Sequence, residues 1–325
     1  MDVVVEPLGD DERARVAAVA ELYYLEGVLV EEIGARLGMS RSTVSRNLAK
    51  ARRWGVIEFV LHRNANGAEA GLLASRLKER YGAQAHVVPT EAAAGPSERL
   101  EVVSELAAQR LASIVGSEST VTVAWGTTIE AVGRHLAPSP TRGSRVIQHN
   151  GSGNTFTSGV HYAGRVLDLF GLAFTATVHH FAVPAFFDSA ETRRAMWAER
   201  SVQRVLAMRA NADIAVFSVG ALSSDVPGHL YRSGYLDESD LSDLQRHGVV
   251  GDLGSVFLRA DGTSDGIEIN DRSTGMPIDD LRQVPVRVLV VSGPGKAPAV
   301  AGALRAGAVT DLVVDDVTAR AVLDV

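Results

Sequence analysis

The chain has 325 residues, of which 46% are hydrophobic and 22% charged, and it contains no cysteine. This length predicts about two domains that can each bury a core, and the two fractions exclude disordered, collagen-like and low-complexity chains. The lack of cysteine excludes a disulfide scaffold, a thiolate zinc site, an iron–sulfur cluster and a cysteine nucleophile, and is consistent with a cytoplasmic protein.

The net charge of −7 disfavours a nucleic-acid partner, but the charge is unevenly distributed. Residues 36–63 contain seven arginines and lysines, opposed only by Glu58. A local basic face can bind phosphates on an acidic protein, whereas a solvated helix face is the alternative, and charge alone leaves both open. The uncharged segment 170–187 contains histidines and a proline, which favours a helix end and a buried strand, so no membrane partner is expected.

Three helical segments open the chain, over residues 12–27, 30–37 and 40–54. Gly38 suits the tight turn between the second and third, and Ser40 suits an N-cap. The small core between these two helices is expected to contain Ala35, Leu37, Val44 and Leu48. A strand over residues 56–61 and a turn over 63–67 complete the element order of a winged helix-turn-helix. We therefore expect a DNA-binding domain over residues 1–63 and an effector and oligomerisation domain over 64–325.

The third segment has the pattern of a recognition helix. Early residues of such a helix reach base edges in the major groove, and basic residues further along contact phosphates. Arginine can pair with guanine, and hydroxyls reach bases or phosphates. The alternative is a three-helix packing module whose basic face meets solvent or another protein. We expect double-stranded operator DNA as the partner, contacted by Ser40, Arg41, Ser42, Thr43, Ser45, Arg46, Lys50 and Arg53.

From residue 68 onward, predicted helices and strands alternate. The strands are nearly continuous apolar runs, which predicts a mostly parallel α/β sheet. The expected helices cover residues 68–81, 97–115, 129–136, 160–170, 189–211, 237–247 and 296–306. The expected strands cover residues 84–88, 121–125, 145–150, 175–183, 214–219, 254–258, 286–292 and 311–315.

Glycine and polar residues follow several of these strands, and ligands of open α/β sheets bind at the carboxyl ends of strands. Gly126-Thr127-Thr128 places N–H groups and hydroxyls at a helix N-terminus, which suits a phosphate, although an ordinary N-cap is the alternative. Asp252 could bind a sugar hydroxyl, and Arg232 and Lys296 could neutralise a phosphate. Each of these three charged residues could instead form a surface ion pair.

The chain as a whole resembles the SorC/DeoR-type family of bacterial sugar-binding transcriptional regulators. The resemblance rests on residues 21–27, 124–128, 248–252 and 312–323, together with Gly293 and Lys296. It implies a C-terminal domain similar to ribose-5-phosphate isomerase and glucosamine-6-phosphate deaminase, without their activity, in a homo-oligomer that is usually a tetramer. It also implies a sugar or sugar-phosphate effector. Together the motifs give these effector-binding residues: Gly126, Thr127, Thr128, Asn150, Gly151, His161, Gly220, Arg232, Asp252 and Lys296.

Three details refine these expectations. Family members that bind a sugar covalently use a lysine, and this chain has only Lys50, Lys78 and Lys296, so a Schiff base is not expected. The small polar residues of the loop 151–154 favour a non-phosphorylated sugar or a polyol. Adjacent histidines on a strand, His179 and His180, point to opposite faces, so no metal site is expected, and no cofactor either.

The main alternative to a regulator is an active sugar-phosphate isomerase or deaminase with an appended DNA-binding domain. Proton transfer at a sugar carbon needs a positioned carboxylate base, for which Asp252 is the candidate. No second acid occurs at a matching spacing. We therefore expect a non-enzymatic regulator whose operator affinity is controlled by a sugar, polyol or sugar phosphate.

Overall fold

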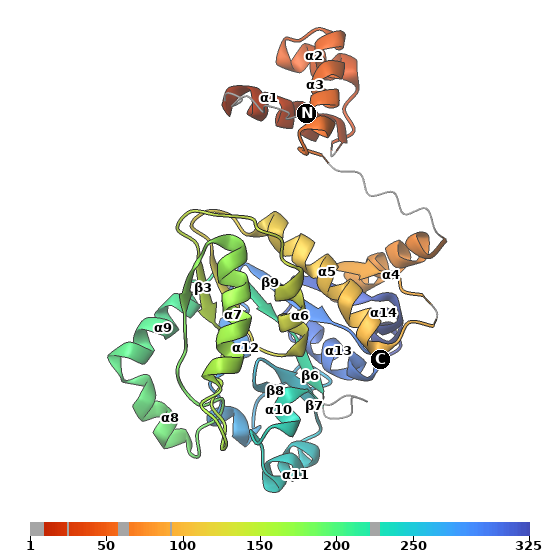
Figure 1. Ribbon diagram of the computed structural model, residues 1–325. Coiled ribbons are helices and arrows are strands. Elements are labelled where there is room, and N and C mark those ends of the chain that lie inside the picture. Colours follow the sequence, from red (N-terminus) through yellow and green to blue (C-terminus); the bar gives the residue numbers. More distant parts are fainter. Residues whose placement is uncertain (1–9, 25, 58–64, 92, 222–227) are drawn as a thin grey trace. The chain divides into compact units, whose positions relative to one another are not determined.

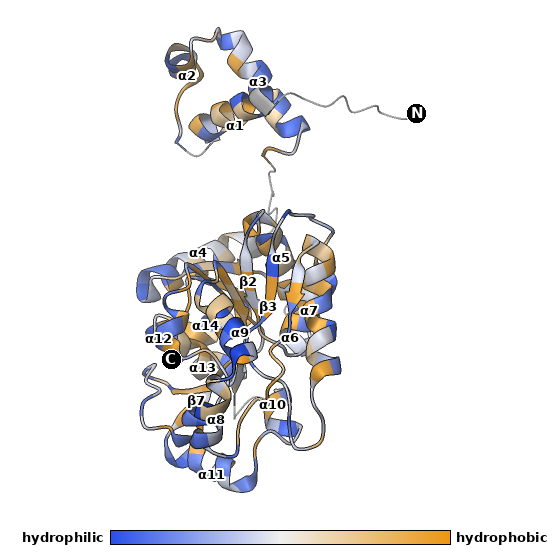
Figure 2. Ribbon diagram, turned by 90° about the vertical axis from the view of Figure 1, so that its left-hand side faces the viewer, coloured by the Kyte–Doolittle hydropathy of each residue, from blue (hydrophilic) through white to orange (hydrophobic). Residues whose placement is uncertain are grey.

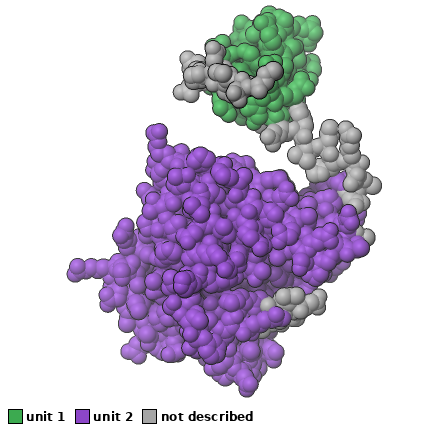
Figure 3. Space-filling model, viewed as in Figure 1, with its two compact units in different colours: residues 1–63 green, residues 64–325 purple. Residues whose placement is uncertain are grey.

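The chain folds into two compact units, residues 1–63 and residues 64–325 (Figure 1, Figure 3). The computed structural model describes residues 10–24, 26–57, 65–91, 93–221 and 228–325. Each unit has apolar core clusters of its own. Within the described ranges, every helix is too short or too polar to cross a bilayer.

The first unit consists of three helices, α1 (Asp10–Tyr24), α2 (Val30–Leu37) and α3 (Arg41–Arg53). Val44 and Leu48 of α3 pack against Ile33 of α2, as the apolar spacing predicts. The predicted core residues Ala35 and Leu37 are wrong, because both are exposed. Helix α2 instead buries Ile33 and Gly34 against α3, so Ala35 and Leu37 lie on the solvent side of a helix only eight residues long.

The end of the first unit differs from the predicted wing. Val56 and Ile57 are not in a strand, because both backbone N–H groups donate to the carbonyl of Ala51 at the end of α3. Their side chains pack on the core that α1 and α3 form. The rest of the predicted strand and the start of the predicted turn lie outside the described residues. Residues 65–67, which the sequence predicts to lie in a loop turn, are instead the first residues of helix α4.

The second unit contains a seven-stranded parallel sheet with the order β1-β10-β9-β5-β2-β3-β4. A parallel sheet buried on both faces explains the apolar strands predicted from the sequence. Strand β9 illustrates this, because Val288 and Val290 face one core while Leu289 and Val291 face the other. The strands are β1 (Gln84–Val88), β2 (Thr120–Val123), β3 (Arg145–Gln148), β4 (Thr177–His179), β5 (Ile214–Phe217), β9 (Val286–Val291) and β10 (Asp311–Asp315).

Helices cover both faces of this sheet (Figure 1). Helices α5 (Pro96–Ile114), α6 (Thr127–His135) and α7 (Val160–Phe174) pack on one face. The other face is covered by α4 (Ala65–Tyr81), α13 (Ala297–Arg305) and α14 (Asp316–Leu323). The hydropathy colouring shows the orange strands enclosed between these layers (Figure 2).

A smaller antiparallel sheet, β6-β7-β8, adds to the second unit and was not predicted as a sheet. It consists of β6 (Val219–Ala221), β7 (Val249–Leu253) and β8 (Val256–Arg259). The remaining elements are the helices α8 (Ala190–Trp197), α9 (Arg200–Ala210), α10 (His229–Arg232), α11 (Glu238–Arg246) and α12 (Ile278–Leu281), and the 3₁₀ turns η1 (Glu268–Asp271) and η2 (Pro294–Lys296).

Two predicted elements of this unit differ from the structure, one in length and one in continuity. The predicted strand over residues 175–183 reduces to β4, because the N–H of Phe181 donates to the side chain of Gln148 and not to a neighbouring strand. The predicted helix over residues 189–211 is two helices, because the extended backbone of Glu199 (φ −70°, ψ 135°) ends one and begins the next.

Candidate functional site

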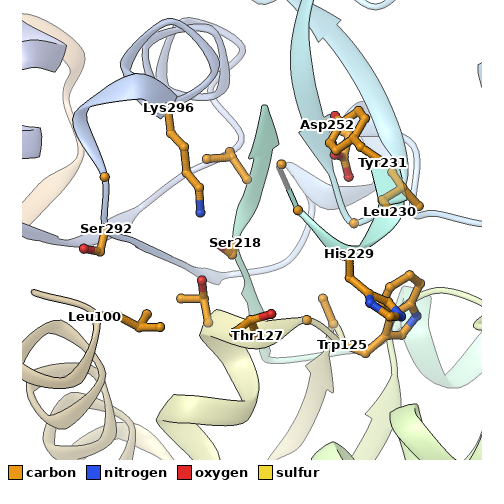
Figure 4. Close-up of a pocket in the computed structure, with 18 of the residues that line it drawn as sticks. Leu100, Trp125, Thr127, Ser218, His229, Leu230, Tyr231, Asp252, Ser292 and Lys296 are labelled. Atoms are coloured by element: carbon orange, nitrogen blue, oxygen red, sulfur yellow. Dashed lines mark hydrogen bonds between the residues drawn. The ribbon is translucent and has the colours of Figure 1, made fainter. Parts of the chain in front are cut away.

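A cavity of about 340 Å³ opens at the carboxyl ends of β2, β5 and β9 (Figure 4). The residues that follow these strands line it: Trp125 and Gly126 after β2, Ser218 after β5 and Ser292 after β9. The first turn of α5 and residues of β6, β7 and α10 complete its wall. Because parallel strands end at the same edge of a sheet, this is the position at which an α/β fold binds a ligand.

One end of the cavity has the features of an anion site. Gly126 (φ 146°) and Gly293 (φ 112°) turn the chain from β2 into α6 and from β9 into η2, with backbone angles that favour glycine. Neither α5 nor α6 has a side-chain N-cap hydrogen bond. The N-termini of both helices therefore offer backbone N–H groups and a partial positive charge toward an anion.

Two cations add to this positive potential. The Lys296 side chain reaches into the cavity, as Figure 4 shows. Burial lowers the pKa of Lys296, and the nearby Asp252 carboxylate acts in the opposite direction. Arg99, in the first turns of α5, also lines the cavity, and its Nε is buried without a hydrogen-bond partner among the described residues. A bound anion would compensate both groups.

Among the described residues that line the cavity, Asp252 is the only one with a carboxylate side chain. Its Oδ1 accepts a hydrogen bond of 2.7 Å from the Tyr231 hydroxyl, and its Oδ2 accepts one of 3.0 Å from the backbone N–H of Ser255. Burial raises the pKa of Asp252, while these hydrogen bonds lower it. Gly220 permits this packing, because a Cβ at that position would lie 2.1 Å from Oδ1 of Asp252.

Most of the effector-binding residues predicted from the sequence lie at this cavity. They are Gly126, Thr127, Thr128, Asn150, Gly220, Asp252 and Lys296. The structure does not bring the other three to it. Gly151 packs against the carbonyl of Pro184 and donates its N–H to Thr274. The side chains of His161 and Arg232 are exposed at the surface, outside the cavity lining.

Sequence reasoning missed several residues of the cavity wall, among them Arg99, Ser218, His229 and Tyr231. Arg99 could have been found, because Gly95-Pro96 marks a helix start one turn before it. His229 and Tyr231 belong to α10, the four-residue helix that also contains the predicted residue Arg232, but no local pattern shows that His229 and Tyr231, and not Arg232, line the cavity.

The first unit presents α3 as a basic face. The side chains of Arg41, Ser42, Ser45, Arg46 and Arg53 are exposed. Ser40 caps the helix as predicted, since its Oγ accepts from the N–H of Thr43 at 3.2 Å. The Ser40 hydroxyl also lies 2.8 Å from that of Thr43, so part of the predicted contact set stabilises the helix start. Arg41 pairs with Glu31 at 2.8 Å, and Lys50 pairs with Glu12.

The described residues contain no group of three or more His, Cys, Asp or Glu side chains placed to hold a metal ion. His180 is exposed and His179 partly buried. Burial and the nearby Arg204 and Arg145 lower the pKa of His179. Within the described part of the chain, the two histidines belong to no such group.

Comparison with known proteins gives the family. Residues 68–324 match the Sugar-bind family, described as "Putative sugar-binding domain", and residues 1–59 match a family described as ECF sigma factor. The chain is 32% identical to the deoxyribonucleoside regulator of Bacillus subtilis over 308 residues, which are 94% of this chain and 96% of that protein. It is also 32% identical to the transcriptional regulator LsrR of Klebsiella pneumoniae, over 96% of this chain and 93% of that protein.

Solved structures agree with the fold. A domain of a possible sugar-binding transcriptional regulator from Arthrobacter aurescens is 44% identical, with a TM-score of 0.74, covering 81% of this chain and all of that one. The full-length sorbitol operon regulator SorC from Klebsiella pneumoniae has a TM-score of 0.71 at 21% identity, over 97% of this chain and all of that one, which is a likeness of fold. The chain therefore belongs to the SorC/DeoR-type family of sugar-binding transcriptional regulators.

Proposed function

We propose that this chain binds operator DNA through α3 and that a sugar phosphate in the cavity of the second unit changes the affinity for the operator. The effector would act by binding one of two arrangements of the regulator more tightly than the other. The proposal thus assigns recognition of DNA and of the metabolite to separate units of one chain.

One observation carries the choice of a phosphorylated effector over a neutral sugar or polyol. Two helix N-termini without side-chain caps, those of α5 and α6, meet at one cavity with Lys296 and Arg99. With a neutral ligand, Asp252 would be the one carboxylate of the described lining to offset both Lys296 and Arg99, and uncompensated charge in a partly buried site costs free energy. A phosphate group satisfies the cations and the helix N-termini together.

The DNA-binding role of α3 is supported by its exposed side chains and by the turn that precedes it. Gly38 adopts φ 64° between α2 and α3, which sets the crossing of the two helices. Exposed Arg46 and Ser45 lie within the first two turns of α3, where a recognition helix reads bases. The contact set that we retain consists of Arg41, Ser42, Ser45, Arg46, Lys50 and Arg53, with Ser40 and Thr43 shaping the helix start.

The sequence resemblance implies that the second unit is similar to sugar-phosphate isomerases and deaminases. We propose further that this unit does not catalyse a reaction. Proton transfer at a sugar carbon needs a carboxylate base together with an acid partner. Asp252 accepts hydrogen bonds from the Tyr231 hydroxyl and the backbone N–H of Ser255, which hold its carboxylate in place and leave a lone pair on each oxygen for a ligand hydroxyl. The described lining of the cavity offers no second carboxylate as an acid partner.

A homo-oligomer follows from the DNA-binding role. Symmetric assemblies present recognition helices in pairs, so we propose a dimer or tetramer that reads an operator with a two-fold repeat. Such a regulator would act on DNA in the cytoplasm.

The test is a thermal-shift screen of the full chain with sugars, polyols and their phosphates. A ligand at 100 times its Kd stabilises the folded chain by about 2.7 kcal/mol. We expect phosphorylated sugars alone to give shifts, and Thr128→Ala and Lys296→Ala to remove them. Lys78→Ala changes an exposed lysine outside the cavity lining and is the matched control. Shifts with neutral polyols only, or no effect of the effector on operator affinity, would contradict the proposal.

A further inference from the structure

The cavity has two chemically different ends. Figure 4 shows Lys296, Ser292 and Leu100 on one side and Leu230, His229 and Trp125 on the other. The first side carries the helix N-termini and cations that suit a phosphate. The second side carries aromatic rings, with Asp252 and Tyr231 next to them. A ligand that spans the cavity therefore meets an anion site at one end and a ring-lined wall at the other.

The aromatic end is a packed cluster of four rings. The Trp125 ring stacks on Tyr235 with centroids 5.2 Å apart and an interplanar angle of 24°. The His229 ring stands perpendicular to Trp125 at 6.1 Å and lies 4.7 Å from Tyr162. These separations lie within the range in which aromatic pairs attract one another.

Hydrogen bonds hold the rings in place. Trp125 Nε1 donates to the carbonyl of Gly151 at 3.0 Å, and the Tyr235 hydroxyl donates to the carbonyl of Ser152 at 3.0 Å. His229 Nδ1 lies 3.0 Å from the hydroxyl of Ser233. Because the rings are fixed before a ligand arrives, little side-chain entropy is lost on binding.

The cluster suits an apolar face better than an anion. Burial lowers the pKa of His229, so the imidazole is neutral near pH 7. Trp125 and His229 both line the cavity and both are partly exposed. The ring of a sugar presents a face of C–H groups and an edge of hydroxyls. Aromatic rings can pack on the first, and the neighbouring Asp252 can accept a hydrogen bond from the second.

We propose that Trp125 and His229 are specificity-determining residues that select the cyclic form of a sugar phosphate over the open-chain alcohol of the same length. The inference rests on the proposed function, because it takes the phosphate to lie at the Lys296 end. An open-chain polyol phosphate reaches the same anion site but presents no continuous C–H face to the two rings.

The test compares matched pairs of probes on the full chain: D-glucose 6-phosphate with D-glucitol 6-phosphate, and D-ribose 5-phosphate with D-ribitol 5-phosphate. Inorganic phosphate is a fifth probe, which occupies the anion end alone. The open-chain alcohols lose more internal freedom on binding, so some preference for the ring remains in every variant. The quantity to compare is therefore the ratio of the affinities for the cyclic and the open-chain probe. The inference is tested by how far this ratio falls when the aromatic side chain of Trp125 or His229 is removed.

We expect Trp125→Leu and His229→Leu each to reduce this ratio roughly two- to tenfold, the range of one aromatic contact. Trp125→Phe keeps a ring and should restore most of the ratio. Trp197→Leu is the matched control, since Trp197 packs against Phe181 and Phe187, outside the cavity lining. Unchanged binding of inorganic phosphate to each variant will show that the anion end is intact.

The outcomes separate this inference from the proposed function. If phosphates bind but the ratio is the same in the unaltered chain, Trp125→Leu and His229→Leu, the aromatic selection is wrong and the phosphate site stands. If the open-chain alcohols bind more tightly, the selection is also wrong. If none of the five probes binds the unaltered chain, both proposals fail.

Discussion

The Tyr231 hydroxyl donates a hydrogen bond of 2.7 Å to Oδ1 of Asp252, and the Asp252 residue is only 5% exposed. A buried carboxylate depends on such donors, because water no longer solvates its charge. The carboxylate in turn affects the tyrosine, since burial and the adjacent Asp252 carboxylate raise the pKa of Tyr231 well above its ordinary value. The pair is thus a neutral phenol donating to an acid that borders the proposed effector site.

Tyr231→Phe should destabilise the second unit in a pH-dependent manner. Burial raises the pKa of Asp252, and the hydrogen bond from Tyr231 lowers it. Because the variant lacks this hydrogen bond, the pKa of its Asp252 should be higher still. An acid with a raised pKa in the folded state reduces stability as pH rises above its unfolded pKa. We expect a loss on the order of 1–3 kcal/mol at pH 7.5 that shrinks toward pH 4.

Thermal unfolding at several pH values measures this effect. Tyr81→Phe is the matched control, because the Tyr81 hydroxyl donates to the backbone carbonyl of Val322, which does not titrate. A loss in Tyr231→Phe that is equal at pH 4 and pH 7.5 would show that Asp252 is not the group affected.

His149 should make the second unit sensitive to acid. Burial, and secondarily the charge of Arg209, lowers the pKa of His149 to about 3. Below pH 6.5 the unfolded chain takes up a proton that folded His149 cannot, so stability falls as pH drops from about 6.5 toward 3. The maximum slope is about 1.4 kcal/mol per pH unit.

His149→Gln removes this titration and keeps a polar side chain near Thr122, to which the His149 ring nitrogen lies 3.3 Å away. We expect the variant to be less stable at pH 7.5 but to lose less stability between pH 7 and pH 4.5 than the unaltered chain. Thermal unfolding curves across this range measure both. Parallel curves for the two proteins would mean that His149 takes up its proton over the same pH range in the folded and the unfolded chain.

Much of the second unit was predictable because its strongest patterns are local. Strands β1 and β10 have the predicted bounds, since Pro89 follows β1 directly and Asp311 and Asp315 enclose the three apolar residues of β10. The small antiparallel sheet was missed because its first strand, β6, begins two residues after β5 ends, so the two strands form one pattern in the sequence. Periodicity cannot show where a continuous apolar run leaves one sheet for another.

The candidate site was predictable on one side only. Gly126, Thr128 and Lys296 follow strands directly, so the rule about strand ends locates them. Arg99 and His229 reach the same cavity from helices that the chain brings there by tertiary packing. The wrong core residues of α2 have a similar cause, because the close approach of Gly34 to the carbonyl of Met39 determines which face is buried.

Gly220→Ala should abolish effector binding. The added Cβ would lie 2.1 Å from Oδ1 of Asp252 and 2.8 Å from the Tyr231 ring, so both side chains must move. Overpacking of this kind typically costs about 1–3 kcal/mol. Ligand-induced thermal shifts with D-ribose 5-phosphate and D-glucose 6-phosphate measure the loss. Gly71→Ala, in α4 with open space around its Cβ, is the control and should leave the shifts intact. Normal shifts in Gly220→Ala would place the sugar away from Asp252.

Arg46→Ala should weaken DNA binding in a way that reveals what Arg46 contacts. Arg41 is paired with Glu31 at 2.8 Å, whereas Arg46 is exposed and has no ion pair within the described part of the chain. If Arg46 binds a phosphate, its removal lowers the slope of log affinity against log salt by about 0.9. If it reads a base, affinity for the selected duplex falls by about 1–3 kcal/mol and affinity for random DNA changes little.

Fluorescence anisotropy with a duplex selected in vitro by the full chain, at several salt concentrations, separates these results. Arg142→Ala, which changes an exposed arginine of the second unit, is the matched control. Equal affinity and equal salt slope for Arg46→Ala and the unaltered chain would remove Arg46 from the interface. Since Arg46 lies in the middle of the exposed face of α3, that result would also contradict α3 as the recognition helix.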